Sequence, residues 1–174
     1  NNTAIGHNAL GVNTTGAHNT AVGTASLDAN QTGEKNTAVG SNALGANTVD
    51  ENTAMGYYAL SNNTTGTYNT AMGVQAMHLT TTSSRHTAVG YFALDASNSG
   101  DRNTAMGFQA LTSLTTGGHN TAIGQQALNA NNANNNVAVG SVALVSNTTG
   151  TGNVAMGYAT LYSNTTSSRN TAIG

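Results

Sequence analysis

The residues whose side chains can act as acids, bases or metal ligands are few in this chain. The five histidines and six acidic residues are His7, His18, His78, His86, His119, Asp28, Glu34, Asp50, Glu51, Asp95 and Asp101. Catalysis requires such groups within hydrogen-bond distance of one another. Here the histidines fall at different positions of the repeat described below, except that His18 and His119 share a position about six coils apart. Every acidic residue falls in the polar loop of the repeat. We therefore expect solvated loop residues, no catalytic centre and no enzymatic activity.

Metal and cofactor sites are not predicted either. The chain contains no cysteine, which excludes disulfides and thiolate metal sites. Calcium-binding β-rolls carry a repeated column of aspartates, whereas the repeats of this chain carry Asn and Thr. The sequence thus offers no ligand set for a metal ion or a cofactor.

Aromatic side chains are the remaining candidates for a binding surface. Most of them occupy the two variable positions that follow a repeated glycine, and these residues are Tyr57, Tyr58, Tyr91, Phe92, Phe108 and Tyr158. Exposed aromatic rings stack on sugars or anchor protein interfaces. Two interpretations stay open, because the rings either contact a cell-surface glycan or receptor, or cover the coil and face a partner chain.

A repeated pentapeptide organises the whole chain. The pattern Asn-Thr-Ala-apolar-Gly recurs eleven times at a spacing of seventeen residues, with two spacings of sixteen. A fixed period of this kind indicates stacked units that share one core. Helical repeats need about 33 to 47 residues per unit, so residues 1–174 are predicted to form one all-β array. The expected fold is a parallel β-solenoid of about ten coils, about 48 Å long at ~4.8 Å per coil.

The unit that begins at Asn103 serves as the example for the roles inside one coil. Residues 104–106 alternate as in a strand, and residues 110–111 are predicted to form a second short strand. The apolar column to which Met106 belongs is expected to fill the interior. Ala105 belongs to a column without replacements, which indicates close packing against a neighbouring chain or a tight bend within the coil. Gly107 indicates a positive φ or a close backbone approach.

Charge and hydropathy exclude two classes of partner. The chain has four Lys and Arg against six Asp and Glu, for a net charge of −2. Nucleic acids and anionic membranes are held by basic surfaces, and a membrane-spanning helix needs about eighteen consecutive apolar residues. The sequence has neither feature, so we expect no nucleic acid and no membrane insertion. It lacks an initiator Met and stops on the Gly of an eleventh pentapeptide, which favours a fragment of a longer fibrous chain.

The repeat resembles two families of fibrous proteins. Residues 136–140 read Asn-Val-Ala-Val-Gly, which is similar to the head repeats of trimeric autotransporter adhesins and to repeats of trimeric bacteriophage tail fibres. The resemblance implies a left-handed β-roll, a homotrimer, and a location outside the cell, on its surface or on a virion. The adhesin period is shorter, and the additional residues here lie in the polar loop, which favours the fibre-type relatives.

Four functions are compatible with these patterns. The leading hypothesis is a non-catalytic shaft or head segment of an extracellular or virion fibre. The alternatives are a surface that binds a glycan or receptor through the aromatic residues, and a subunit that stacks end to end into a homopolymer. The last is an ice-binding solenoid, for which the Thr column supplies one Thr per coil, interrupted by Val137 and Val154.

Overall fold

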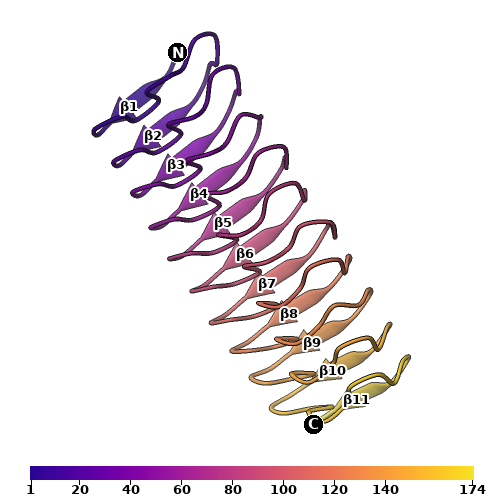
Figure 1. The fold of residues 1–174 in the computed structure, drawn as a ribbon. Helices are drawn as coiled ribbons and strands as arrows, with labels where there is room; N and C mark the ends of the chain where they lie inside the picture. The colour runs from indigo at the N-terminus through magenta and orange to yellow at the C-terminus, as the bar shows by residue number, and fades with distance from the viewer.

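A computed structural model describes all residues 1–174 and confirms the parallel β-solenoid (Figure 1). Each coil contains one three-residue strand, and the strands pair in sequence order in one parallel sheet. The strands are β1 (Thr3–Ile5), β2 (Thr20–Val22), β3 (Thr37–Val39), β4 (Thr53–Met55), β5 (Thr70–Met72), β6 (Thr87–Val89), β7 (Thr104–Met106), β8 (Thr121–Ile123), β9 (Val137–Val139), β10 (Val154–Met156) and β11 (Thr171–Ile173).

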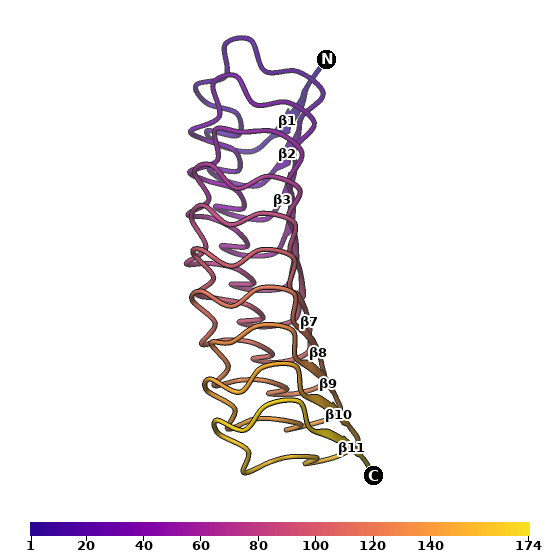
Figure 2. The same cartoon turned by 90° about the vertical axis from the view of Figure 1, so that its right-hand side faces the viewer.

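The coils stack with identical residues in register. Between β7 and β8, for example, Ala105 pairs with Ala122 and Met106 with Ile123. The sheet follows one side of the rod, turns form the rest of each coil, and the two termini lie at opposite ends (Figure 2). The structure contains no helix that is long and apolar enough to span a lipid bilayer.

The core of the rod is narrow and built from small residues. It consists of the strand alanines, a second alanine column and the leucine column, exemplified by Ala105, Ala110 and Leu111, which are all fully buried. Close packing leaves little room for added methyl groups at such positions. The strand alanine therefore packs inside its own coil, and the interpretation that it faces a neighbouring chain is wrong.

The apolar strand column lies outside the core, which corrects a second expectation. Side chains of a strand alternate between its two faces, so the inward position of Ala105 turns Thr104 and Met106 outward. Met106 is 42% exposed and Ile123 is 39% exposed. The leucine column from the opposite side of the coil already fills the interior, which leaves space only for an alanine in each strand.

The predicted second strand is also wrong. Residues 110–111 lie in a turn, where Gln109 has a φ of 53° and Leu111 a φ of 54°. Such left-handed conformations cost an L-residue roughly 1–2 kcal/mol. Burial of the leucine side chain, which contributes about 1.5–3 kcal/mol, offsets this cost at Leu111 because the turn directs it into the core.

The repeated glycine is required for two reasons. Gly107 has a φ of +139°, and a Cβ placed there would lie 2.5 Å from the carbonyl oxygen of Gly124 in the next coil. Only a residue without a side chain satisfies both conditions. The role of this column in turning each coil at close backbone distance is confirmed.

The first residue of each pentapeptide forms a buried polar ladder. Asn103 and Asn120 are each 1% exposed. The Asn120 backbone N–H donates to Asn103 Oδ1 at 2.9 Å, and Asn103 Nδ2 donates to the Gly117 carbonyl across its own coil at 2.9 Å. A primary amide donates and accepts at once, so one side chain links successive coils and closes its own coil.

Candidate functional surfaces

The aromatic residues at the first position after glycine lie on the surface. Tyr57, Tyr91 and Phe108 are exposed, and Val74 occupies the same position in the coil between the two tyrosines. The rings of Tyr91 and Phe108 stack with centroids 5.7 Å apart and planes 8° apart. Four successive coils therefore present a continuous apolar column at this position.

The aromatic residues at the second position are partly buried and support the first. Tyr58 lies edge to face with Tyr57 at 4.5 Å, and Phe92 lies in the same way against Tyr91 at 4.4 Å. The structure thus brings five of the six candidates together in two clusters. Tyr158 lies three coils beyond Phe108 and is 79% exposed, apart from both clusters.

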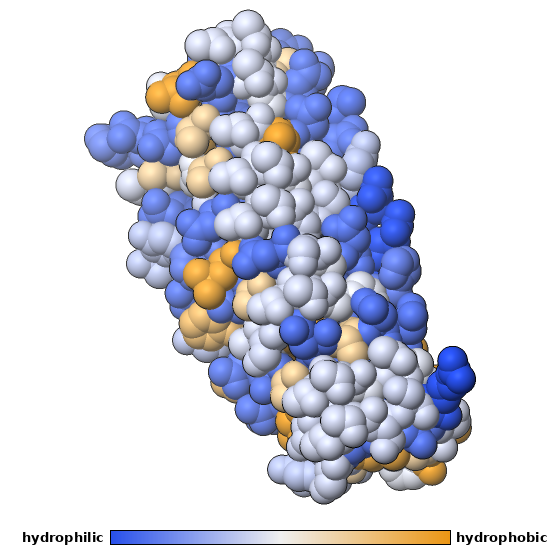
Figure 3. Space-filling model, turned by 45° about the vertical axis from the view of Figure 1, so that its right-hand side comes forward, coloured by the Kyte–Doolittle hydropathy of each residue, from blue (hydrophilic) through white to orange (hydrophobic).

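The outer face of the sheet is a second apolar surface. It consists of the Thr column and the apolar column of the strands, and we call it the strand face. Its most exposed apolar residues in the inner coils are Met55, Met72, Met106, Ile123 and Met156. In the view of Figure 3 the hydrophobic residues form small, separate clusters.

The residue before each pentapeptide forms a charged edge. Arg85 Nη1 lies 3.9 Å from Asp101 Oδ2 in the next coil. Arg102 Nη1 lies 3.5 Å from His119 Nε2. These side chains are exposed, and ion pairs in such settings contribute little to stability. The edge is a solvated surface.

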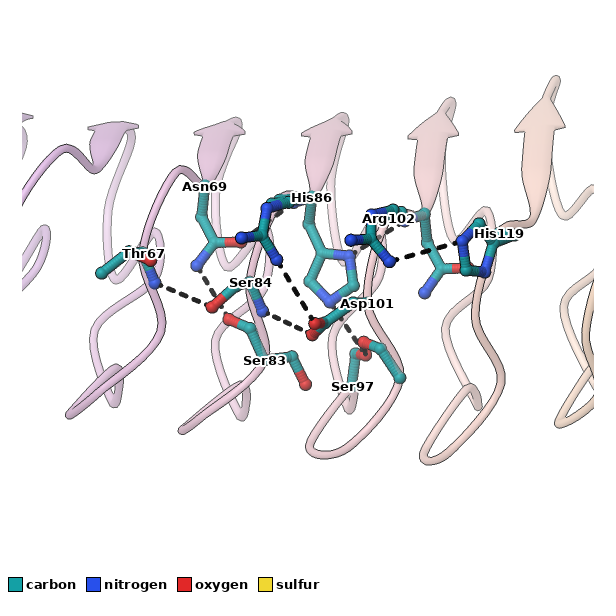
Figure 4. Close-up of polar contacts among 12 residues, drawn as sticks. Thr67, Asn69, Ser83, Ser84, His86, Ser97, Asp101, Arg102 and His119 are labelled. Carbon is teal, nitrogen blue, oxygen red and sulfur yellow. Dashed lines mark hydrogen bonds and ion pairs between the residues drawn. The ribbon is translucent and has the colours of Figure 1, made fainter.

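His86 is the one histidine that the sequence analysis placed wrongly, because it is fully buried. It replaces Asn in the polar ladder, and its backbone N–H donates to Asn69 Oδ1 at 3.0 Å (Figure 4). Its Nε2 lies 3.2 Å from Ser97 Oγ, and that hydroxyl donates to the Gly100 carbonyl at 3.2 Å. Burial lowers the pKa of His86 to about 4, although the nearby Asp101 carboxylate acts in the opposite direction.

A Ser, a His and an Asp occupy one position in three successive coils. Ser61 Oγ and His78 Nδ1 are 2.8 Å apart. Burial raises the pKa of the Asp95 carboxyl, and its Oδ1 has no hydrogen-bond partner. A catalytic triad requires the acid to hydrogen-bond the histidine. The arrangement lacks this bond, and the chain holds no group of three potential metal ligands.

A single hollow of about 320 Å³ opens beside Ser61, between the turns that follow β2, β3 and β4. Polar groups of Asp28, Asn42 and Asn62 line it together with the ring of Tyr58. The sequence analysis identified only Tyr58 in this region. The other lining residues recur at sixteen- or seventeen-residue spacing around Gly45. A comparison of equivalent positions in adjacent repeats could therefore have identified this group of residues in the sequence.

Comparison with known proteins adds no relative, since no family model, curated protein or solved structure matches the chain.

Proposed function

We propose that the chain is a non-catalytic structural segment of an extracellular or virion fibre and that three copies associate through the strand face. The observation that carries this proposal is the outward position of the apolar strand column. Every coil places Ile, Val or Met at the same point of one face, from Ile5 to Ile173. Soluble monomers rarely expose a contiguous apolar stripe of this length.

The regularity of the strand face favours another copy of the same chain as its partner. Its apolar side chains repeat once per coil, at about 4.8 Å in a parallel sheet. A second solenoid has the same repeat, so parallel copies match coil by coil along their whole length. Most oligomers of identical chains are closed symmetric assemblies, and the resemblance to trimeric fibre repeats favours three copies.

Stiffness suits the molecule to a shaft. The chain makes 105 backbone hydrogen bonds, and the buried Asn ladder adds side-chain bonds between consecutive coils. Each coil contacts mainly its neighbours, as in other repeat proteins. Such a rod keeps a binding tip at a fixed distance from an anchor.

Mass measurement in solution tests the proposal. Light scattering or sedimentation is expected to give about three times the chain mass of 17.4 kDa. The double variant Met106→Glu with Ile123→Glu places charges on the strand face and is expected to dissociate the assembly without unfolding the coils. The matched control is Ser113→Glu with Ser163→Glu, at two exposed turn positions. A wild-type chain that stays monomeric would refute the trimer.

Ice binding is a second candidate, favoured by the same face. Thr104 and Met106 both point outward, so the Thr column borders an exposed apolar column on a regular sheet. Thermal hysteresis of the wild-type chain distinguishes the two candidates. Hysteresis lost on substitution of the Thr column would favour ice binding, and its absence would leave the structural role.

A further inference from the structure

The hollow beside Ser61 exists because one position of its turn lacks a side chain. Gly45 occupies the position held by Asp28 in the preceding coil and by Ser61 in the following coil. A Cβ at Gly45 would meet no atom closer than 3.4 Å, and its φ is not positive. At the equivalent Gly11, Asp28 Oδ1 already fills this space, 2.6 Å from the Cβ position. The backbone does not require glycine at Gly45, and an added Cβ would make only ordinary van der Waals contacts there.

His78 lies behind one wall of the hollow and contacts three of its residues. His78 Nδ1 lies 2.8 Å from Ser61 Oγ, and the His78 carbonyl accepts a hydrogen bond from Asn62 Nδ2 at 2.8 Å. The His78 ring also packs edge to face against Tyr58 at 5.5 Å. The Ser61 hydroxyl, the Asn62 amide and the Tyr58 ring are thus held by contacts with His78. Ligand binding would therefore cost little side-chain conformational entropy.

The lining combines groups that suit a ligand rich in hydroxyls. Asp28 lines the hollow with its Oδ1 turned toward Gly11 of the preceding coil. Asn42 Nδ2 donates to Ser41 Oγ and Asn62 Nδ2 to the His78 carbonyl, so each amide keeps its oxygen as an acceptor and one further N–H as a donor. Tyr58 also lines the hollow, and its ring supplies apolar surface. The Asp28 carboxylate repels an anion, and the absence of further acidic side chains in the lining disfavours a metal ion. At about 320 Å³, the hollow lies at the lower end of ligand pockets, which span about 300–1,000 Å³.

We propose that this hollow binds one ring of a neutral saccharide. Tyr58 packs against the C–H face of the ring, and Asp28 and Asn42 bind its hydroxyl groups. His78 acts as a positioning residue that holds the wall. The residues that line the hollow lie in the turns of the coils, whereas the strand face is formed by the strands. The proposal therefore goes beyond the structural role and does not depend on the number of chains in the assembly.

Saturation-transfer NMR on the intact chain tests the site. The probes are glucose, galactose, mannose, fucose, N-acetylglucosamine and N-acetylgalactosamine, with N-acetylneuraminic acid as an anionic comparison. We expect transfer to at least one neutral sugar and none to the anionic one. Gly45→Tyr fills the hollow and is expected to weaken binding at least tenfold. The equivalent position in β10's coil already holds Tyr162, so this column accommodates a tyrosine.

Asn129→Tyr is the matched control, because Asn129 occupies the equivalent position in a coil far from the hollow. It should bind the sugar as the wild type does, and circular dichroism should be the same for both variants. Three outcomes would overturn the proposal. These are the absence of transfer to every neutral sugar at about 10 mM, where even millimolar affinity is detected, equal binding by Gly45→Tyr, and preferential binding of N-acetylneuraminic acid.

The role of His78 has its own test. His78→Phe keeps a ring against Tyr58 but removes the nitrogen that faces Ser61 Oγ. We expect several-fold weaker saccharide binding with an unchanged denaturation midpoint. His78→Asn restores a polar partner and should recover part of the affinity. Equal affinity of His78→Phe and the wild type would remove His78 from the site.

Discussion

The backbone N–H of Asn103 donates to Nδ1 of His86 at 3.1 Å. In all the remaining steps of this ladder, the acceptor is the side-chain oxygen of an Asn. Because Nδ1 accepts this bond, the proton of the neutral ring lies on Nε2, which donates to Ser97 Oγ at 3.2 Å. Protonation of Nδ1 would place two N–H groups face to face in a buried site. His86 is therefore a neutral ladder member whose hydrogen bonds fit only one protonation state.

Acid should weaken the coil that contains His86. Its pKa is lowered from 6.5 to about 4, so the unfolded state takes up a proton before the folded state does. The stability that neutral His86 contributes is complete above pH 6.5 and is lost as the pH falls toward 4. At pH 4 the loss amounts to about 3 kcal/mol. Urea denaturation at a series of pH values measures it.

His86→Asn is the matched control for the acid effect. The amide restores the bonding of the other coils, with Oδ1 accepting from Asn103 and Nδ2 facing the Gly100 carbonyl. The pKa of Asp95 is raised in the folded state, so its protonation stabilises the fold as the pH falls, opposite to the effect of His86. This effect of Asp95 is present in both the wild type and His86→Asn. The difference between them isolates His86. An identical pH dependence of the two chains would contradict the prediction.

Two neighbouring residues of β8 should differ in their tolerance of valine. Ala122 is fully buried, so Ala122→Val adds two methyl groups to a filled core and is expected to cost about 1–3 kcal/mol. Thr121 points outward and pairs with Val137, so Thr121→Val should change the free energy of unfolding by less than about 0.5 kcal/mol. Denaturant titration of both variants checks the direction of the two side chains, and a larger cost for Thr121→Val would reverse it.

The period of the sequence was sufficient to predict the solenoid, but not the direction of the strand residues. Strand alternation allows two phases, and hydrophobicity favours the phase with Met106 inside rather than Ala105. The deciding fact is the width of the coil, which has space for Leu111 and an alanine only. The turn at Leu111 was not predictable in the same way, because leucine rarely adopts a positive φ.

The functional features required comparison of columns rather than single residues. The departure of His86 from the Asn column is visible in the sequence, but its burial depends on knowing that the column points inward. The hollow depends on Gly45 lying between Asp28 and Ser61 in three dimensions. The spacings of sixteen and seventeen residues are sufficient to predict that these three residues are neighbours. The orientation of the Tyr58 and His78 side chains could not be predicted from the sequence.

Two glycines should differ sharply in their tolerance of alanine. Gly107→Ala introduces a side chain at a φ of +139° and places Cβ 2.5 Å from a backbone oxygen, so it should cost at least about 3 kcal/mol. Gly45→Ala meets only ordinary van der Waals distances and should leave the denaturation midpoint nearly unchanged. Comparable losses in both variants would show that the close approach at Gly107 is not required.

The charged edge offers a stabilising substitution. Arg102 has a φ of 59°, and the equivalent positions hold Asn135 and Gly152, also at positive φ. Asparagine tolerates this conformation better than arginine does, and the Arg102 guanidinium faces His119 Nε2. Arg102→Asn is therefore expected to raise the free energy of unfolding by about 0.5–1 kcal/mol. Arg102→Val, with a branched Cβ that disfavours positive φ, should lower it by at least about 1 kcal/mol. Denaturation midpoints of the two variants at equal pH and salt measure the difference, and equal midpoints would mean that the left-handed conformation carries no strain at this edge.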